Sequence, residues 1–358
     1  MLRCRGCCRK KQGIDCEMQF ESGGIELAEE DISKLFEKMA CKMEWGVLVA
    51  PVQRVSGGFI HRMYRVETTS GTYAVKLLNP EVMKREGVFA NYEKAERLER
   101  LLQEHDIPLV PALAREGKKM HCIDGRYFYA FDWVVGRSLP SEEIRAVHCE
   151  IVGAILARIH KIEQIEKPVE IEPLCVDWDM HIAMAVERCP EIVRVLQENR
   201  ALLYAYQEEA NGAFRKIPPF QCICHGDMDS KNVFWVDGEA KLIDLECLDY
   251  WSPYMEMFNL ALCWSGCEHF EIDYELLRVF VRSYMQEYGA VQLDWDALYA
   301  TNINMFVWLD YNVKRALRIE SEDEEECKLG IEQVQYAMKR MVQYAAEKER
   351  ILAAFRSA

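Results

Sequence analysis

The sequence predicts a two-lobed α+β protein with a β-rich N-terminal lobe followed by a mostly helical C-terminal lobe. Three observations lead to this fold class. Strand-like runs separated by glycine turns are concentrated before residue 135, and helical spacing of apolar residues dominates after residue 140. The third is size: with 358 residues, 50% of them hydrophobic, the chain is long enough to bury a core in two lobes.

The N-terminal lobe is predicted to span residues 31–135, after an extension over residues 1–30 that we expect to be disordered. The first element is a helix over residues 31–44, where apolar residues recur at helical spacing. Ser56-Gly57-Gly58 joins the first two strands, and Ser70-Gly71 makes a tight turn before the third. We expect strands over residues 47–55, 62–69, 72–78, 121–124 and 126–134, and a second helix over residues 86–104.

The C-terminal lobe is predicted to span residues 136–358 and to be mostly helical. Ser141-Glu142-Glu143 is typical of a helix start and predicts a helix that runs to about His160. One hairpin interrupts the helices, because the apolar runs 233–236 and 240–243 flank the turn dipeptide Asp237-Gly238. Helical patterns return after Tyr250 and continue to the C-terminus.

The charge and hydropathy of the chain argue against two classes of partner, nucleic acids and membranes. A net charge of −15 and a pI of 5.2 argue against nucleic acid, whose binders carry a basic face. An acidic protein can attract cationic substrates, although solubility is the commoner reason for such a charge. The longest uncharged apolar run, residues 257–267, is far shorter than the roughly 18–20 residues that cross a bilayer. We therefore expect no membrane partner.

Fifteen cysteines are a high and odd number for a chain without a secretory signal. We interpret them as reduced thiols of a cytoplasmic protein. Cys4, Cys7, Cys8 and Cys16 near the N-terminus are able in principle to hold a metal ion. They lack a second ligand pair at a supporting spacing, so the interpretation as a disordered extension is favoured.

The segment with the clearest chemical signal begins at Cys224 and contains His225-Gly226-Asp227. Asn232 follows Asp227 by five residues, and Asp244 follows Asn232 by twelve. An aspartate beside a hydroxyl group can accept its proton during phosphoryl transfer, and amide and carboxylate oxygens are the ligands that Mg²⁺ prefers. Any one of these residues alone is better explained as structural. Together, and split by a hairpin, they favour phosphoryl transfer.

These motifs strongly resemble those of the aminoglycoside phosphotransferase and choline kinase superfamily, the phosphotransferase enzyme family with a protein-kinase-like fold. The HGDxxxxN and IDxE motifs of the family occur in order, whereas the HRD and DFG motifs of ordinary protein kinases are replaced. The resemblance covers about residues 47–266. It implies that Asp227 is the catalytic base, that Asn232 and Asp244 bind Mg²⁺, and that His225 is structural.

Residues of the N-terminal lobe are candidates for binding ATP. Ser56, Gly57 and Gly58 would let the backbone approach phosphate groups, although most such glycine pairs are only hairpin turns. Lys76 lies in an otherwise apolar strand, where a buried lysine needs a partner. The resemblance implies that Lys76 contacts the α- and β-phosphates and pairs with a glutamate of the next helix. Glu96 is the first choice for this glutamate and Glu93 is the alternative.

Residues 131–139 resemble the hinge of the same family. The resemblance implies that backbone groups of Asp132, Trp133 and Val134 bind the adenine, while the Trp133 side chain is favoured as a core aromatic. Glu246 stands where protein kinases have glycine. It either organises metal ligands or caps the following turn, and the sequence leaves both open.

The predicted function is ATP- and Mg²⁺-dependent transfer of the γ-phosphoryl group to a hydroxyl of a small molecule, such as an aminoglycoside-like amino sugar. The alternatives are a choline- or ethanolamine-type kinase and a non-catalytic pseudokinase that acts as a binding module. A cationic acceptor is conceivable, since acidic and aromatic residues occur in the C-terminal helices, but aromatic residues at helical spacing are more often core. These residues are Trp264, Glu268, Glu271, Asp273, Trp308, Asp310 and Tyr311.

Overall fold

A computed structural model describes residues 29–55, 61–320 and 322–358, which form two compact units. The sheet unit consists of the described residues up to Ser138 together with residues 225–249. The helical unit consists of residues 139–224 and the described residues from Tyr250 to the C-terminus. Residues 225–249 thus group with the β-rich unit, although the predicted lobe boundary at residue 135 assigns them to the C-terminal lobe.

The sheet unit is built on a five-stranded antiparallel sheet with strand order β1-β2-β3-β5-β4. The predicted first strand is shorter than expected, because Val47 and Val49 are exposed and only Leu48 forms a bridge, to Thr68. The elements are β1 Gln53–Val55, β2 Arg62–Thr68, β3 Gly71–Leu77, β4 His121–Ile123, β5 Arg126–Asp132, α2 Glu29–Met43, α3 Pro80–Met83 and α4 Val88–Glu104.

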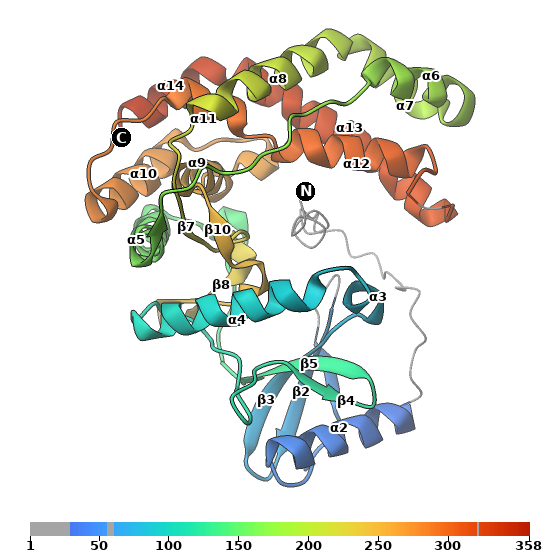
Figure 1. Ribbon diagram of the computed structural model, residues 1–358, viewed down its shortest axis with the longest axis vertical. Coiled ribbons are helices and arrows are strands. Elements are labelled where there is room, and N and C mark those ends of the chain that lie inside the picture. The colour runs from blue at the N-terminus through green and yellow to red at the C-terminus, as the bar shows by residue number, and fades with distance from the viewer. Residues whose placement is uncertain (1–28, 56–60, 321) are drawn as a thin grey trace. The chain divides into compact units, whose positions relative to one another are not determined.

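Helices cover both faces of this sheet (Figure 1). Successive side chains of a strand point to opposite faces, and the two core clusters follow this alternation. Val75 and Phe128 pack with α2, whereas Tyr129, one residue further along β5, packs with α3 and α4. Lys76 is paired in register with Tyr129. The lysine therefore lies on the α4 face of the sheet.

The sheet unit also contains a β-hairpin, which is hydrogen-bonded to the segment between α4 and β4. Asp237 and Gly238 both have positive φ (51° and 86°), as a two-residue hairpin turn requires, so the predicted hairpin is confirmed. Leu242 exchanges backbone hydrogen bonds of 2.9 Å with Pro108 and Val110. The elements are η3 Ser230–Asn232, β8 Val233–Val236, β9 Glu239–Leu242 and η4 Leu245–Cys247.

The helical unit confirms the predicted helical character of the C-terminal half. Its short sheet has the order β10-β7-β6, with β6 Gln164–Ile165, β7 Gln221–Cys224 and β10 Asp249–Trp251. Its helices are α5 Ala146–Ile162, α6 Trp178–Arg188, α7 Pro190–Glu198, α8 Arg200–Ala213, α9 Pro253–Trp264, α10 Tyr274–Tyr288, α11 Trp295–Thr301, α12 Asn304–Ala316, α13 Glu324–Ala346 and α14 Lys348–Arg356. None of the helices in the described ranges combines the length and apolarity needed to cross a membrane.

The predicted start of the helix at Ser141 is wrong. Ser141–Glu143 forms a separate 3₁₀ turn, and Ile144 leaves it in an extended conformation (φ −65°, ψ 134°) with a buried side chain. Helix α5 begins at Ala146 after Arg145, whose backbone N–H donates to His148 Nδ1 at 3.0 Å. Burial of Ile144 thus interrupts a segment whose sequence resembles one continuous helix start.

Candidate active site

The loop that carries Asp227 depends on glycine at position 226. Gly226 has φ +78°, a conformation that L side chains rarely adopt. A Cβ atom at this position would lie 2.8 Å from the carbonyl oxygen of Cys247. Two backbone segments therefore touch here, one leading to Asp227 and the other following Asp244, and no larger residue fits between them.

We expect Gly226→Ala to lower kcat/KM by about 10²-fold, because the clash with Cys247 must displace the segment that positions Asp227. Gly238→Ala is the matched control, since Gly238 has φ +86° but a Cβ atom there would meet no described residue within 4 Å beyond its chain neighbours. It carries similar backbone strain without a clash. Steady-state kinetics of both variants check the prediction, and equal losses in the two would contradict it.

Asn232 holds the Asp227 carboxylate in place. Its Nδ2 donates to the Asp227 backbone oxygen at 2.7 Å and to Asp227 Oδ2 at 2.8 Å. Because both hydrogen bonds use Nδ2, Oδ1 is the atom of this side chain suited to binding a cation. The Lys231 ammonium lies 3.5 Å from Asp227 Oδ1, which places positive charge beside the carboxylate.

Asn232 also connects Asp227 to Asp244. The backbone oxygen of Asn232 accepts a hydrogen bond from Ile243 N at 3.0 Å, and Asp244 is the next residue. Asp244 has a left-handed backbone (φ 62°, ψ 53°), which is uncommon for a residue other than glycine although aspartate tolerates it better than most. Such conformations cluster at functional sites. The predicted residues Asp227, Asn232 and Asp244 are thus brought together within the sheet unit.

Lys76 forms a largely buried ion triad with Asp244 and Glu246. Its Nζ lies 2.6 Å from Asp244 Oδ1 and 2.5 Å from Glu246 Oε2. Burial alone would lower the pKa of Lys76, but the two carboxylates raise it well above its usual value, so the ammonium stays charged. Glu246, whose role the sequence leaves open, is therefore a counter-ion of this lysine.

The expected pair of Lys76 with Glu96 is not formed among the residues that the structure describes. Glu96 Oε1 instead accepts hydrogen bonds from Met120 N at 2.9 Å and from the Tyr129 hydroxyl at 3.0 Å. Tyr129 is the register partner of Lys76 and reaches Glu96 from the same face of the sheet. The alternative, Glu93, is exposed. A nucleotide-binding role for Glu96 stays a prediction.

His61 is a site residue that sequence reasoning missed. Its ring is 2% exposed, and Nδ1 accepts a hydrogen bond from Asn79 N at 3.0 Å. Nε2 lies 3.3 Å from the Tyr92 hydroxyl and 3.6 Å from Glu246 Oε1. His61 therefore lies beside the carboxylate that pairs with Lys76. A lone histidine before a strand carries no signal of such a contact.

The predicted hinge residues lie at the end of β5. Trp133 N donates to Thr72 O at 3.0 Å, so this N–H is used within the sheet unit, and Asp132 and Val134 flank it. The Trp133 ring is half-buried beneath the Arg65 guanidinium, 5.1 Å from the ring centroid, rather than in the core. Adenine binding by these three residues stays a prediction. Ser56, Gly57 and Gly58 lie outside the described residues.

Gly136 and Arg137, which follow the predicted hinge, pack closely against the backbone of β8. A Cβ atom at Gly136 would lie 2.5 Å from the Trp235 carbonyl oxygen. Arg137 and Trp235 exchange backbone hydrogen bonds of 3.2 and 2.8 Å. The segment after the predicted hinge is thereby hydrogen-bonded to the hairpin, and Asn232 and Asp244 lie at the two ends of this hairpin.

Of the aromatic candidates for cation binding in the helical unit, Trp264 and Trp308 are core residues, as favoured from the sequence. Tyr311 is half-buried, with the Arg315 guanidinium 5.5 Å from its ring centroid. Trp264 and Trp308 are 1% and 6% exposed, and Trp308 Nε1 donates to Gln333 Oε1 at 3.0 Å. Asp310 is within hydrogen-bond distance of His181 (3.0 Å) and accepts from Lys314 (2.7 Å). Both tryptophan rings are therefore largely shielded from solvent.

The donor set of the sheet unit fits a magnesium-bound nucleotide. The Asn232 amide oxygen and the Asp244 carboxylate are hard oxygen ligands, the type that Mg²⁺ selects. Lys76 beside them supplies positive charge of the kind that balances phosphate oxygens. The arrangement combines a carboxylate able to accept a proton, two side chains with oxygen atoms able to bind a cation, and an ammonium group.

Comparison with known proteins adds a family match. The profile described as "Phosphotransferase enzyme family" matches residues 51–300, which include every described residue of the site. No curated protein matches the chain in sequence.

Several solved structures share the fold. A spectinomycin phosphotransferase in complex with ADP and spectinomycin is 12% identical with a TM-score of 0.64, covering 89% of this chain and 99% of its own. A choline/ethanolamine kinase family protein from Mesorhizobium loti is 14% identical with a TM-score of 0.56 (90% and 100% covered). An amicoumacin kinase in complex with AMP-PNP and Ca²⁺ is 14% identical with a TM-score of 0.54 (88% and 96%). The matches confirm the predicted protein-kinase-like fold.

Proposed function

The chain belongs to the phosphotransferase enzyme family, and on this basis we propose that it transfers the γ-phosphoryl group of ATP, with Mg²⁺, to a hydroxyl group of a small molecule. The family makes it an enzyme, which disfavours the pseudokinase alternative. The observation that carries the proposal is the double role of Asn232, which holds Asp227 through its side chain and Ile243, next to Asp244, through its backbone.

In the proposed reaction Asp227 accepts the proton of the acceptor hydroxyl as the hydroxyl oxygen attacks the γ-phosphorus. The bond from the γ-phosphorus to the oxygen that bridges it to the β-phosphate breaks, and ADP leaves. The hydrogen bond from Asn232 Nδ2 to Oδ2 orients the carboxylate. Bound Mg²⁺, held by Asn232 Oδ1 and Asp244, would neutralise charge on the phosphate oxygens. Lys76 contributes a second positive charge, and Glu246 keeps its ammonium beside Asp244.

We favour an aminoglycoside-like amino sugar as the acceptor. A spectinomycin phosphotransferase of the same fold was solved with spectinomycin bound. The net charge of −15 favours a cationic acceptor through electrostatic steering. A choline- or ethanolamine-type acceptor is the alternative, since a choline/ethanolamine kinase family protein also shares the fold.

ADP formation by the purified full chain tests the proposal. The assay contains ATP and Mg²⁺, with aminoglycosides, other amino sugars, choline or ethanolamine added in turn. Turnover with amino sugars, and its loss when EDTA removes the metal, is the expected result. Turnover with choline or ethanolamine alone would replace the favoured acceptor. Failure to bind ATP in the presence of Mg²⁺ would overturn the proposal.

Asp244→Asn is expected to raise the Mg²⁺ concentration for half-maximal activity by at least about 10-fold, because it removes charge from a proposed ligand. Asp237→Asn, at the exposed hairpin tip, makes the same change of charge outside the site. Magnesium titrations of initial rates compare the two variants. If activity is too low to measure, Mg²⁺-dependent nucleotide binding serves instead. An unchanged magnesium dependence would remove Asp244 from the ligand set.

A further inference from the structure

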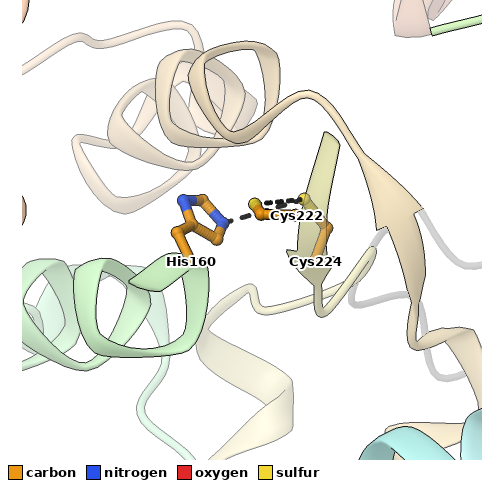
Figure 2. A group of neighbouring side chains, drawn as sticks. All are labelled: His160, Cys222 and Cys224. Atoms are coloured by element: carbon orange, nitrogen blue, oxygen red, sulfur yellow. Dashed lines mark hydrogen bonds between the residues drawn. The ribbon is translucent and has the colours of Figure 1, made fainter. Parts of the chain in front are cut away.

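A second group of chemically active side chains lies in the helical unit, outside the candidate active site. Cys222 and Cys224 are two residues apart on β7, so their side chains point to the same face of the strand. His160, in the last turn of α5, faces them (Figure 2). All three side chains are buried, with exposures of 0%, 2% and 0% for Cys222, Cys224 and His160. Both cysteines are free thiols.

The spacing of these atoms resembles the edges of a tetrahedral zinc site. The two sulfur atoms are 3.8 Å apart, and Cys224 Sγ is 3.8 Å from His160 Nε2. Ligands at about 2.3 Å (sulfur) and about 2.0 Å (nitrogen) from a tetrahedral zinc ion are separated by about 3.8 Å and about 3.5 Å, respectively. All three ligand atoms lie within 4.8 Å of one another, so one ion would reach them with side-chain shifts.

Glu256 and Tyr284 contact the two nitrogens of the His160 ring. Glu256 Oε2, from α9, lies 2.8 Å from His160 Nε2, on the side of the ring that faces the thiols. The other ring nitrogen, Nδ1, lies 2.9 Å from the Tyr284 hydroxyl. A proton on Nδ1 that is donated to this hydroxyl leaves the Nε2 lone pair for a metal, the arrangement common to metal-bound histidines.

We propose that His160, Cys222, Cys224 and Glu256 form a structural zinc site. Two thiolates, an imidazole and a carboxylate make a donor set that suits Zn²⁺, and four protein ligands leave no position open for catalysis. Binding releases the two thiol protons to solvent. The ion joins α5 and α9 to β7, whose last residue, Cys224, directly precedes His225 of the catalytic segment.

Zinc content measured by plasma mass spectrometry tests the site without reference to phosphoryl transfer. The full chain, expressed with zinc, is expected to retain about one ion per chain after dialysis. Cys222→Ser and Cys224→Ser should each lose most of it. Cys149→Ser is the matched control, because Cys149 is also a buried free thiol of this unit but its sulfur contacts Trp264 O at 3.6 Å. It should retain the ion.

The N-terminal cysteines are controlled separately, since they too can bind metal. A chain with Cys4, Cys7, Cys8 and Cys16 all changed to serine should keep its zinc. It should also give the absorption bands of tetrahedral, thiolate-bound cobalt when Co²⁺ replaces zinc. This measurement does not depend on whether the Cys222→Ser and Cys224→Ser variants fold. Absence of both zinc and these bands in this chain, or zinc retention in the Cys222→Ser and Cys224→Ser variants, would overturn the proposal.

Discussion

Asp227→Asn is expected to lower kcat by about 10²–10⁴-fold, the usual contribution of a general base. The change removes proton-accepting ability but little else. An asparagine at position 227 still has an oxygen to accept the hydrogen bond that Asn232 Nδ2 donates to Oδ2 at 2.8 Å in the wild type. Nucleotide affinity is therefore expected to stay close to that of the wild type. Initial rates and an ATP-binding titration on the same preparations measure the two quantities.

The control for this variant is Asp237→Asn, which makes the same chemical change in the same segment of chain. Asp237 is exposed at the tip of the β8–β9 hairpin and has φ 51°, a conformation that asparagine also tolerates. Its activity should match the wild type. Wild-type activity in Asp227→Asn itself would show that the base has been assigned to the wrong residue.

Lys76→Met is expected to abolish activity and to lower the free energy of unfolding by about 3–5 kcal/mol, as when one partner of a buried ion pair is removed. The variant leaves Asp244 and Glu246 together without their shared cation, with side-chain exposures of only 17% and 6%. Chemical denaturation measures the loss.

The pKa of Lys76 is higher in the folded than in the unfolded protein. The contribution of this lysine to the free energy of unfolding is therefore fully present below its unfolded pKa of about 10, and it is lost only as pH rises through its folded pKa.

Two further variants test whether the loss of stability in Lys76→Met comes from the buried ion triad. Lys94→Met breaks a pair with Asp249 whose side chains are 33% and 30% exposed, so a loss of at most about 1 kcal/mol is expected. Adding Glu246→Gln to Lys76→Met removes the excess negative charge and should recover part of the stability without recovering activity. Full stability in the Lys76→Met single variant would contradict the ion triad.

Local patterns were sufficient for most of the helices and strands. The hairpin at Asp237-Gly238 and the strand that contains Lys76 were correctly expected, since a turn dipeptide and a short apolar run are signals that span a few residues. The helix start at Ser141 was wrong because burial of Ile144 breaks a segment that looks continuous.

The sequence by itself determined the fold class, the order of motifs and the residue types of the candidate site, because fold class follows from periodicity and the motifs occupy a few consecutive positions. Only the tertiary structure decided which partners those residues have. Lys76 meets Asp244, 168 residues away, rather than Glu96, which is engaged by Tyr129. His160 likewise meets Cys224, 64 residues away. Such pairs form when packing brings distant segments together, and no local pattern encodes that proximity.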